Sequence, residues 1–140
     1  MIGIIGKLND EYIQLLEKHN IDYSNASNLT DKQIVEEYRN CDIVNFCSTH
    51  EGFGMPIIEA QATGRLVVTS RISPMKEVAG DGAYLVNPYD VSSIRNAYIE
   101  IISDAKLRQN LIEKGLKNIK KYQVNNITKQ HLHLYQQILQ

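Results

Sequence analysis

Short apolar runs alternate with segments of helical periodicity along most of this chain, and this alternation constrains the fold more than any other feature. A run of about four to eight apolar residues is typical of a buried strand. Strands that alternate with helices form βαβ units, in which crossover helices join parallel strands. We therefore expect an α/β fold with a parallel sheet and flanking helices. The expected strands are Ile2–Gly6, Ile21–Tyr23, Asp42–Cys47, Leu66–Ser70 and Ala83–Val86.

Periodicity and capping residues predict the helices between these strands. Thr30 and Gln33 form a capping-box pattern at the start of a helix that runs to about Asn40. Asp90 is the expected N-cap of a helix over Val91–Ser103. Other helices are expected through Tyr12, Leu15, Leu16 and His19, over Pro56–Thr63 with Gly64 as its stop, and around Met75–Ala79.

The length of 140 residues, 43% of them hydrophobic, suits one domain with a packed core. From Asp104 to Gln140 the pattern changes to two further helices, broken near Tyr122–Asn126, which we interpret as a helical C-terminal extension. A lysine cluster in this extension is interpreted as a solvated helix face, with a membrane surface or an acidic partner as the alternative. The cluster consists of Lys114, Lys117, Lys120 and Lys121.

Composition argues against several classes of protein. The net charge of −1 and the pI of about 6.4 predict no nucleic-acid partner. There is no run of about 18 apolar residues and no basic-then-apolar leader, so neither a membrane span nor a secretion signal is expected. Cys41 and Cys47 flank one expected strand, roughly 20 Å apart if extended, which is too far for a disulfide. We expect both thiols to be small buried hydrophobes in a reducing compartment, with no metal bound.

The nine residues Glu51–Glu59 carry the clearest functional pattern: two carboxylates bracket a Gly-Phe-Gly loop and a proline. Glycines let the backbone approach a ligand closely, and proline suits the first helical position. The free N–H groups of a first helical turn favour an anion such as a diphosphate. Glu59, about one turn into the helix, leans back toward the same ligand and is expected to accept hydrogen bonds from a sugar diol. Glu51 is expected to do the same for a second sugar.

A simpler interpretation is a glycine-rich turn before a helix with two surface acids, which is a common arrangement. The context favours the ligand site, because the loop follows the apolar run Ile43–Cys47 and precedes a helix. A strand, a loop and a helix in that order form the place where open α/β sheets bind ligands. His50, beside the motif, has the chemistry of a general base, but a loop histidine is more often a hydrogen-bonding spectator.

Together these residues resemble the C-terminal nucleotide-sugar-binding domain of retaining glycosyltransferases of the GT-B type, in family 4 (group 1). The family hallmark is a glutamate, seven residues and a second glutamate around Gly-Phe-Gly and proline, here Glu51 to Glu59. The resemblance runs from about Ile2 to Tyr122 and is most specific in the centre. Further matches are Cys41–Val44, Ser48, Gly64, Val67–Val68, Ser70, Glu77–Val78, Gly80–Asp81 and Val86–Pro88.

The resemblance implies a Rossmann-like sheet that forms half of a GT-B fold, and a role for each matched residue. Glu51 is implied as the catalytic residue that binds hydroxyls of the transferred sugar. The backbone N–H groups of Gly52, Phe53, Gly54 and Met55 would meet the sugar and diphosphate, and Glu59 would hold the ribose. By position alone, the loop Ser24–Leu29 would line the base pocket. Neither a cofactor nor a catalytic metal is expected.

The chain departs from the family in its extent. It is expected to lack the N-terminal acceptor domain and the first strand and helix of the C-terminal domain, which normally bring a cation to the diphosphate. Lys7, Arg71 and Lys76 are weak substitutes, since each is more often a surface charge. Because the missing strand is normally central, we expect either that five strands close up with Ile2–Gly6 beside Asp42–Cys47, or that an exposed edge pairs with another chain.

The leading hypothesis is a glycosyltransferase donor-binding domain that moves a hexosyl group from a nucleotide-diphosphate sugar to a glycan or lipid acceptor with retention. The chain alone is expected to be inactive. The alternative is a non-catalytic nucleotide-sugar-binding subunit or module; weaker alternatives are a sugar-nucleotide epimerase or a phosphorylase. We expect a role in polysaccharide biosynthesis in the cytoplasm, with the full-length protein peripheral at the inner face of the membrane. Base, sugar and acceptor are not predictable from the residues.

Overall fold

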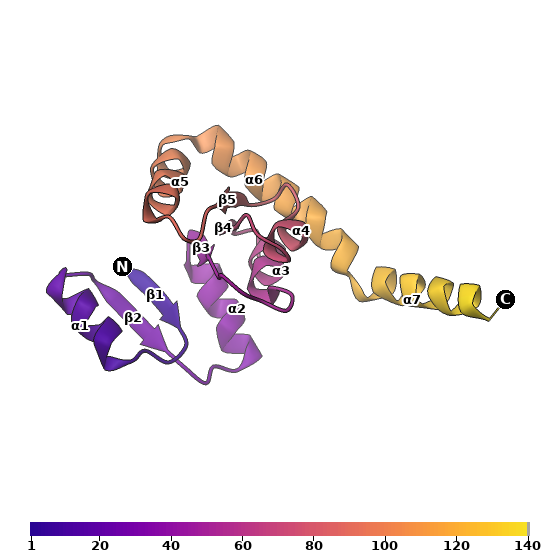
Figure 1. Cartoon of the computed structure of the whole chain (residues 1–140), viewed down its shortest axis with the longest axis horizontal. Coiled ribbons are helices and arrows are strands. Elements are labelled where there is room, and N and C mark those ends of the chain that lie inside the picture. The colour runs from indigo at the N-terminus through magenta and orange to yellow at the C-terminus, as the bar shows by residue number, and fades with distance from the viewer. Residues whose placement is uncertain (140) are drawn as a thin grey trace. The chain divides into compact units, whose positions relative to one another are not determined.

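The computed structural model describes residues 1–139 and divides into two compact units, Met1–Cys41 and Asp42–Gln140 (Figure 1). Helices and strands alternate in both, as the sequence predicts. In chain order the elements are β1 (Ile2–Ile5), α1 (Asp10–Lys18), β2 (Tyr23–Ala26), α2 (Asp31–Asn40), β3 (Ile43–Phe46), α3 (Met55–Ala62), β4 (Leu66–Ser70), α4 (Met75–Ala79), β5 (Tyr84–Val86), α5 (Val91–Ser103), α6 (Ala105–Asn118), the 3-10 helix η1 (Ile119–Tyr122) and α7 (Val124–Ile138).

The first unit contains two parallel strands, β1 and β2, joined by α1, with Ile2 in register with Tyr23. The prediction of a strand over Ile21–Tyr23 is wrong by about two residues, because β2 begins at Tyr23. The shift in the position of β2 is explained by a polar side chain. Asn25 donates from Nδ2 to the carbonyl oxygens of Ile4 (3.0 Å) and Gly6 (2.7 Å). These bonds hold a polar segment in the sheet that hydrophobic periodicity assigns to a loop.

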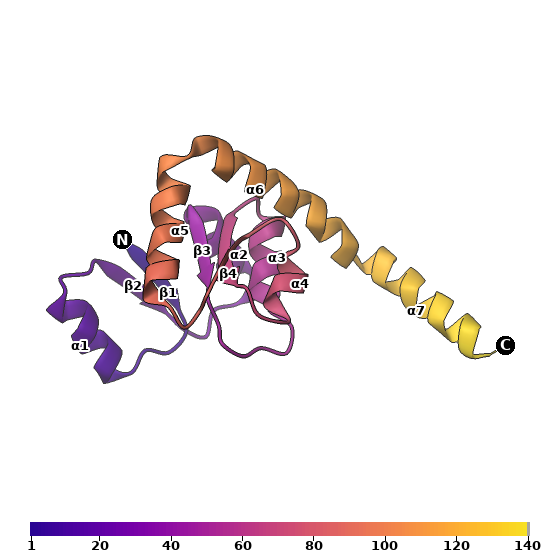
Figure 2. The ribbon, with the colours of Figure 1, turned by 45° about the horizontal axis from the view of Figure 1, so that its top comes forward.

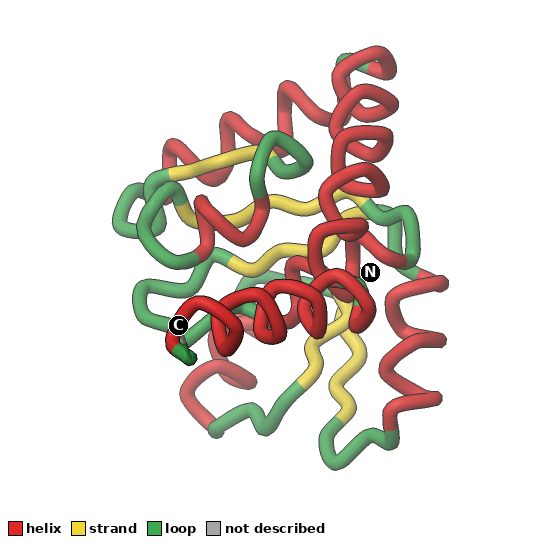
Figure 3. The backbone as a smooth tube through the Cα atoms, turned by 90° about the vertical axis from the view of Figure 1, so that its right-hand side faces the viewer, coloured by secondary structure: helices red, strands yellow, loops and turns green. Residues whose placement is uncertain are grey.

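The second unit contains three parallel strands in the order β3-β4-β5. Figure 3 shows these strands in yellow with helices in red around them. All five residues of β4 are buried, as expected for a central strand covered on both faces. Helix α6 packs against both α3 and β4, and its passage along this unit is visible in Figure 2. Buried core residues here are Leu66, Val68, Val86, Ala97, Ile101 and Leu111.

Several helix boundaries confirm the capping predictions. Thr30 Oγ1 accepts from the Gln33 backbone N–H (3.4 Å) and the Gln33 side chain accepts from the Thr30 N–H (2.9 Å), which is the predicted capping box. Gly64 ends α3 with φ +70°, a conformation that costs glycine little. The side chain of Asp90 caps α5 by accepting from the Ser92 N–H (2.9 Å).

The prediction that all five strands close into one sheet, with Ile2–Gly6 beside Asp42–Cys47, is wrong. The strands form two sheets, β1-β2 and β3-β4-β5. The expectation assumed that an unpaired strand edge would be buried and therefore costly. Three of the four residues of β1 are exposed, so its edge groups remain open to water and the penalty does not arise. A single donor-binding domain over residues 1–140 stays a prediction, as does pairing of a strand edge with another chain.

The helices of residues 1–139 include none with the length and apolar character that crossing a bilayer requires.

Candidate functional site

The Glu51–Glu59 motif lies directly after β3, at the carboxyl end of that strand, and runs into α3. Gly54 is the N-cap of α3 with φ 100° and ψ 49°, a left-handed conformation that suits glycine. A Cβ at Gly54 would come within 3.1 Å of Ile57 Cδ1. The helix begins at Met55, so Pro56 is its second residue instead of its first, still within the turn where a proline removes no helical hydrogen bond.

The backbone of this loop has unused donors. Among residues 1–139, no hydrogen bond is donated by the backbone N–H groups of Gly52, Phe53 or Gly54. At the start of α3 the Ile57 N–H donates to the Gly54 carbonyl (3.0 Å). Gly52 and Phe53 are exposed. At Gly52 and Phe53 the loop therefore offers N–H groups to an anion or a sugar oxygen without first breaking internal bonds, whereas Gly54 is buried.

Side-chain bonds brace the segment between β3 and the loop. Ser48 Oγ lies 3.1 Å from the His50 carbonyl and 3.3 Å from the His50 N–H, which closes a short turn. Ser70, at the end of β4, donates its hydroxyl to the Ser48 carbonyl. The carboxyl ends of two neighbouring strands are thus tied together beneath the loop. His50 itself is exposed.

The two acids of the motif are both half-buried, Glu51 in the loop and Glu59 inside α3. They are ordinary candidates for accepting hydrogen bonds from hydroxyl groups. Glu51, Gly52–Met55 and Glu59 come from one continuous loop and helix, as the sequence predicts. Their assigned roles stay predictions.

The three basic residues considered as ligands for the diphosphate lie in different parts of the chain. Arg71 directly follows β4, at the same carboxyl edge of the sheet as the motif, and its Nη2 lies 3.5 Å from Ser93 Oγ. Lys76 is exposed on α4. Lys7 belongs to the other compact unit.

Tyr122 lies near the loop and is not among the site residues that the sequence predicts. The ring of Tyr122, in η1, meets the ring of Phe53 edge to face, with centroids 5.8 Å apart and planes at 83°. In the sequence Tyr122 marks only the break between the last two helices. No local signal connects it with a loop so far away along the chain.

The family profile described as "Glycosyl transferases group 1" matches residues 1–118. The chain belongs to this family. The resemblance predicted from the Glu51–Glu59 motif is therefore confirmed, and the parallel strands with flanking helices match structures of the GT-B type.

Among sequence relatives of this group 1 chain, the O-antigen chain mannosyltransferase B of Escherichia coli is 34% identical over 88 residues. The match covers 63% of this chain and 23% of the relative, so the chain spans a minor part of the full-length enzyme.

Two solved structures illustrate the fold. The C-terminal domain of the group 1 glycosyl transferase LpcC from Francisella tularensis is 28% identical, with a TM-score of 0.72 over 81% of this chain and 62% of that one. Anabaena Alr3699/HepE, solved with UDP and glucose, is 20% identical, with a TM-score of 0.84 over 96% of this chain and 40% of that one. The second likeness shows the fold alone.

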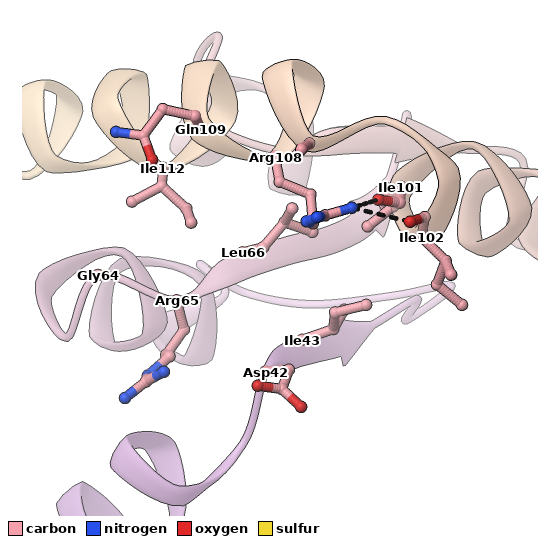
Figure 4. A pocket seen from close by; sticks show the side chains of 11 residues that line it. Asp42, Ile43, Gly64, Arg65, Leu66, Ile101, Ile102, Arg108, Gln109 and Ile112 are labelled. Atoms are coloured by element: carbon pink, nitrogen blue, oxygen red, sulfur yellow. Dashed lines mark hydrogen bonds between the residues drawn. The ribbon is translucent and has the colours of Figure 1, made fainter.

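A pocket of this group 1 chain lies at the end of the strands opposite to the motif. An open pocket of about 680 Å³ is lined by Ile43 and Leu66, where β3 and β4 begin, and by residues of α5 and α6 (Figure 4). Arg108 points across it and donates to the carbonyls of Ile101 (2.7 Å) and Ile102 (2.8 Å), which caps the end of α5. The arginine is thus already engaged, and the motif loop contributes nothing to this pocket.

Proposed function

We propose that this chain is the donor-binding domain of a hexosyltransferase that uses a nucleotide-diphosphate sugar and a glycan or lipid acceptor, with retention of configuration. The observation that carries the proposal is the set of unused N–H groups at Gly52, Phe53 and Gly54, directly before α3 and between two half-buried glutamates. Membership of the group 1 family supports the reaction class. The solved structure of Anabaena Alr3699/HepE with UDP-glucose supports a nucleotide sugar as the donor.

In this proposal each part of the motif binds a different part of the donor. The loop N–H groups and the start of α3 hold the diphosphate, whose charge the helix dipole favours. Glu59 accepts hydrogen bonds from the ribose, and Glu51, the proposed catalytic residue, from the transferred sugar. Stabilisation of the leaving diphosphate is then electrostatic, since donors that are already in place cost no reorganisation during the reaction. The proposal assigns no step to a metal or a cofactor.

The proposal includes a setting for the whole protein. We place it in polysaccharide biosynthesis, in the cytoplasm, peripherally at the inner face of the membrane where glycan and lipid acceptors are available. The O-antigen enzyme among the relatives supports a role in polysaccharide biosynthesis by its name. We also propose that an open strand edge pairs with a second chain, since within residues 1–139 strand β3 has one neighbour only. Sedimentation of the purified chain as a concentration-independent monomer would contradict that pairing.

Calorimetric titration of the chain with UDP, GDP and ADP tests the donor site. We expect saturable binding of one of these nucleotides, weakened about tenfold or more by Glu59→Ala, because hydrogen bonds to a charged group contribute about 1.5–3 kcal/mol. Glu113→Ala removes an exposed acid of α6 and is the matched control. Absence of binding at millimolar nucleotide would contradict the proposal.

A second titration separates the two glutamates. Because Glu51 is assigned to the sugar and Glu59 to the ribose, Glu51→Gln should weaken binding of the nucleotide sugar while leaving the free nucleotide unchanged. Glu59→Gln should weaken both. Equal loss of both ligands in Glu51→Gln would refute its assignment to the sugar. A sugar-transfer assay on the purified chain distinguishes a domain that needs its acceptor half, which turns over nothing, from a complete enzyme.

A further inference from the structure

The contact between Phe53 and Tyr122 joins the donor loop to a distant part of the fold. Phe53 is the middle residue of the Gly-Phe-Gly loop, and the residue is 40% exposed, so the fold covers it only in part. The edge-to-face geometry, with centroids 5.8 Å apart, is the favoured arrangement for two aromatic rings. It is the one aromatic contact recorded for the loop within residues 1–139.

Tyr122 is itself held in place. Its hydroxyl donates to the Val78 carbonyl in α4 (3.2 Å), and burial raises the pKa of its phenol. The same carbonyl accepts from Asn118 Nδ2 (2.8 Å), and Asn118 also donates to Gln61 Oε1 (2.9 Å). Asn118 and Gln61 are almost fully buried. Tyr122 is therefore fixed to a buried polar network that connects α3, α4 and α6.

The loop has few constraints of its own. Two of its residues are glycines, and the N–H groups of Gly52, Phe53 and Gly54 donate no bond within the described residues. A loop with unused donors must still be held in one conformation if those donors are to meet a ligand together, because ordering it on binding costs conformational entropy. The contact of the Phe53 ring with Tyr122 is the part of the loop that can supply this constraint.

We infer that Tyr122 is a positioning residue for the donor loop: its ring holds Phe53 so that the N–H groups of Gly52–Gly54 face the ligand together. The inference rests on the proposed function for its consequence on binding, but its structural part stands by itself. The hydroxyl of Tyr122 anchors the residue, and the ring performs the contact. The effect on the loop is thus expected from loss of the ring and not from loss of the hydroxyl alone.

The first test measures the loop without any ligand. Backbone order parameters from NMR relaxation should be near 0.85 at Gly52–Gly54 in the wild-type chain and fall toward 0.6 in Tyr122→Leu. Tyr122→Phe keeps the ring and should leave them high. Tyr135→Leu, which removes an exposed tyrosine of α7, is the matched control. Unchanged order parameters in a folded Tyr122→Leu would overturn the inference, as would a wild-type loop that is already mobile.

The second test couples the two rings through binding. Using whichever of UDP, GDP or ADP binds the wild type, Tyr122→Leu and Phe53→Leu should each weaken binding about fivefold, the size expected for an aromatic pair. The double variant should be no weaker than either single one, because both remove the same contact. Tyr122→Phe keeps the ring and should bind with wild-type affinity. Additive losses, or unchanged affinity in Tyr122→Leu, would overturn the role in binding, whereas a wild type that binds none of the three would refute the proposed function and leave the relaxation test to decide the contact.

Discussion

The two compact units of this chain use the same βα pattern but differ in how far their elements are buried. In the second unit every residue of β4 is buried, and helices α3, α4 and α6 meet at an interior polar network. In the first unit neither β1 nor β2 contains a fully buried residue, and Tyr38 in α2 is the one buried apolar side chain there.

This difference shows that local pattern and burial are separate contributions to the fold. Helix caps and parallel pairing form in both units, since they need only neighbouring residues and one partner strand. Burial needs a third layer or a further strand, and isolated two-stranded pairs are marginally stable. The candidate donor loop belongs to the unit with the deeper core, as a site whose N–H groups must be held in place requires.

The sharpest test of the contrast compares two glycines. A Cβ at Gly82 would overlap the backbone of Gly115 in α6, so Gly82→Ala should destabilise the second unit by about 3 kcal/mol or more. A Cβ at Gly3 in β1 would meet nothing closer than Ser24 Oγ at 3.8 Å, so Gly3→Ala should change stability by less than about 1 kcal/mol. Urea unfolding followed by far-ultraviolet circular dichroism measures both. Equal effects would remove the distinction between the units.

Removal of the buried network should have the next largest effect. Asn118→Leu deletes the donors to the Val78 carbonyl and Gln61 Oε1 and leaves both acceptors buried, at an expected cost of about 2–3 kcal/mol. Asn110→Leu, at an exposed position on the same helix, is the matched control and should cost little. Thermal unfolding of the two variants checks the pair. A stable Asn118→Leu would show that this network contributes specificity instead of stability.

The two thiols give a test that depends on pH. Burial raises the pKa of Cys47 from 9.0 to about 11, so at pH 8 its thiolate fraction is roughly a hundredth of that of an unshifted thiol. In a Cys41→Ser background, alkylation by iodoacetamide should be slower than that of a model thiol by about that factor. Since the folded chain binds this proton more tightly, the stability it contributes is complete below pH 9 and is lost as the pH rises through 11. Rapid alkylation at pH 8 would contradict the raised pKa that follows from partial burial of Cys47.

Removal of helix caps should have the smallest effects on stability and provides a further comparison of the two units. Thr30→Ala and Asp104→Ala each remove a side chain that caps a helix, α2 in one unit and α6 in the other, at an expected cost of about 1 kcal/mol. In the second unit this loss should lower the global unfolding free energy, because α6 is packed against the core. In the first unit it should appear mainly as faster amide hydrogen exchange in α2. A global effect from both would show that the units unfold together.

Much of the candidate site was predictable from residues that are adjacent in sequence. The spacing of Glu51 and Glu59 around Gly-Phe-Gly and proline indicated a loop that begins a helix, and α3 begins at Met55, one residue before the predicted start at Pro56. The contact of Phe53 with Tyr122 was not predictable, because it depends on where α6 ends relative to the loop. The same holds for the contact of Gln61 with Asn118, two polar residues whose interior position has no signal in hydrophobic periodicity.

The order of strands and helices, the caps at Thr30 and Asp90, the Glu51–Glu59 motif and the family all follow from the sequence. These follow from interactions within a few residues, such as Thr30 with Gln33, or from spacing along one strand or helix. The tertiary structure alone decided that the strands form two sheets, that β2 extends through Asn25, and that Tyr122 lies against the loop. Those features depend on which backbone and side-chain groups from distant segments find partners and which stay in water, and that free-energy difference is set by packing and not by local pattern.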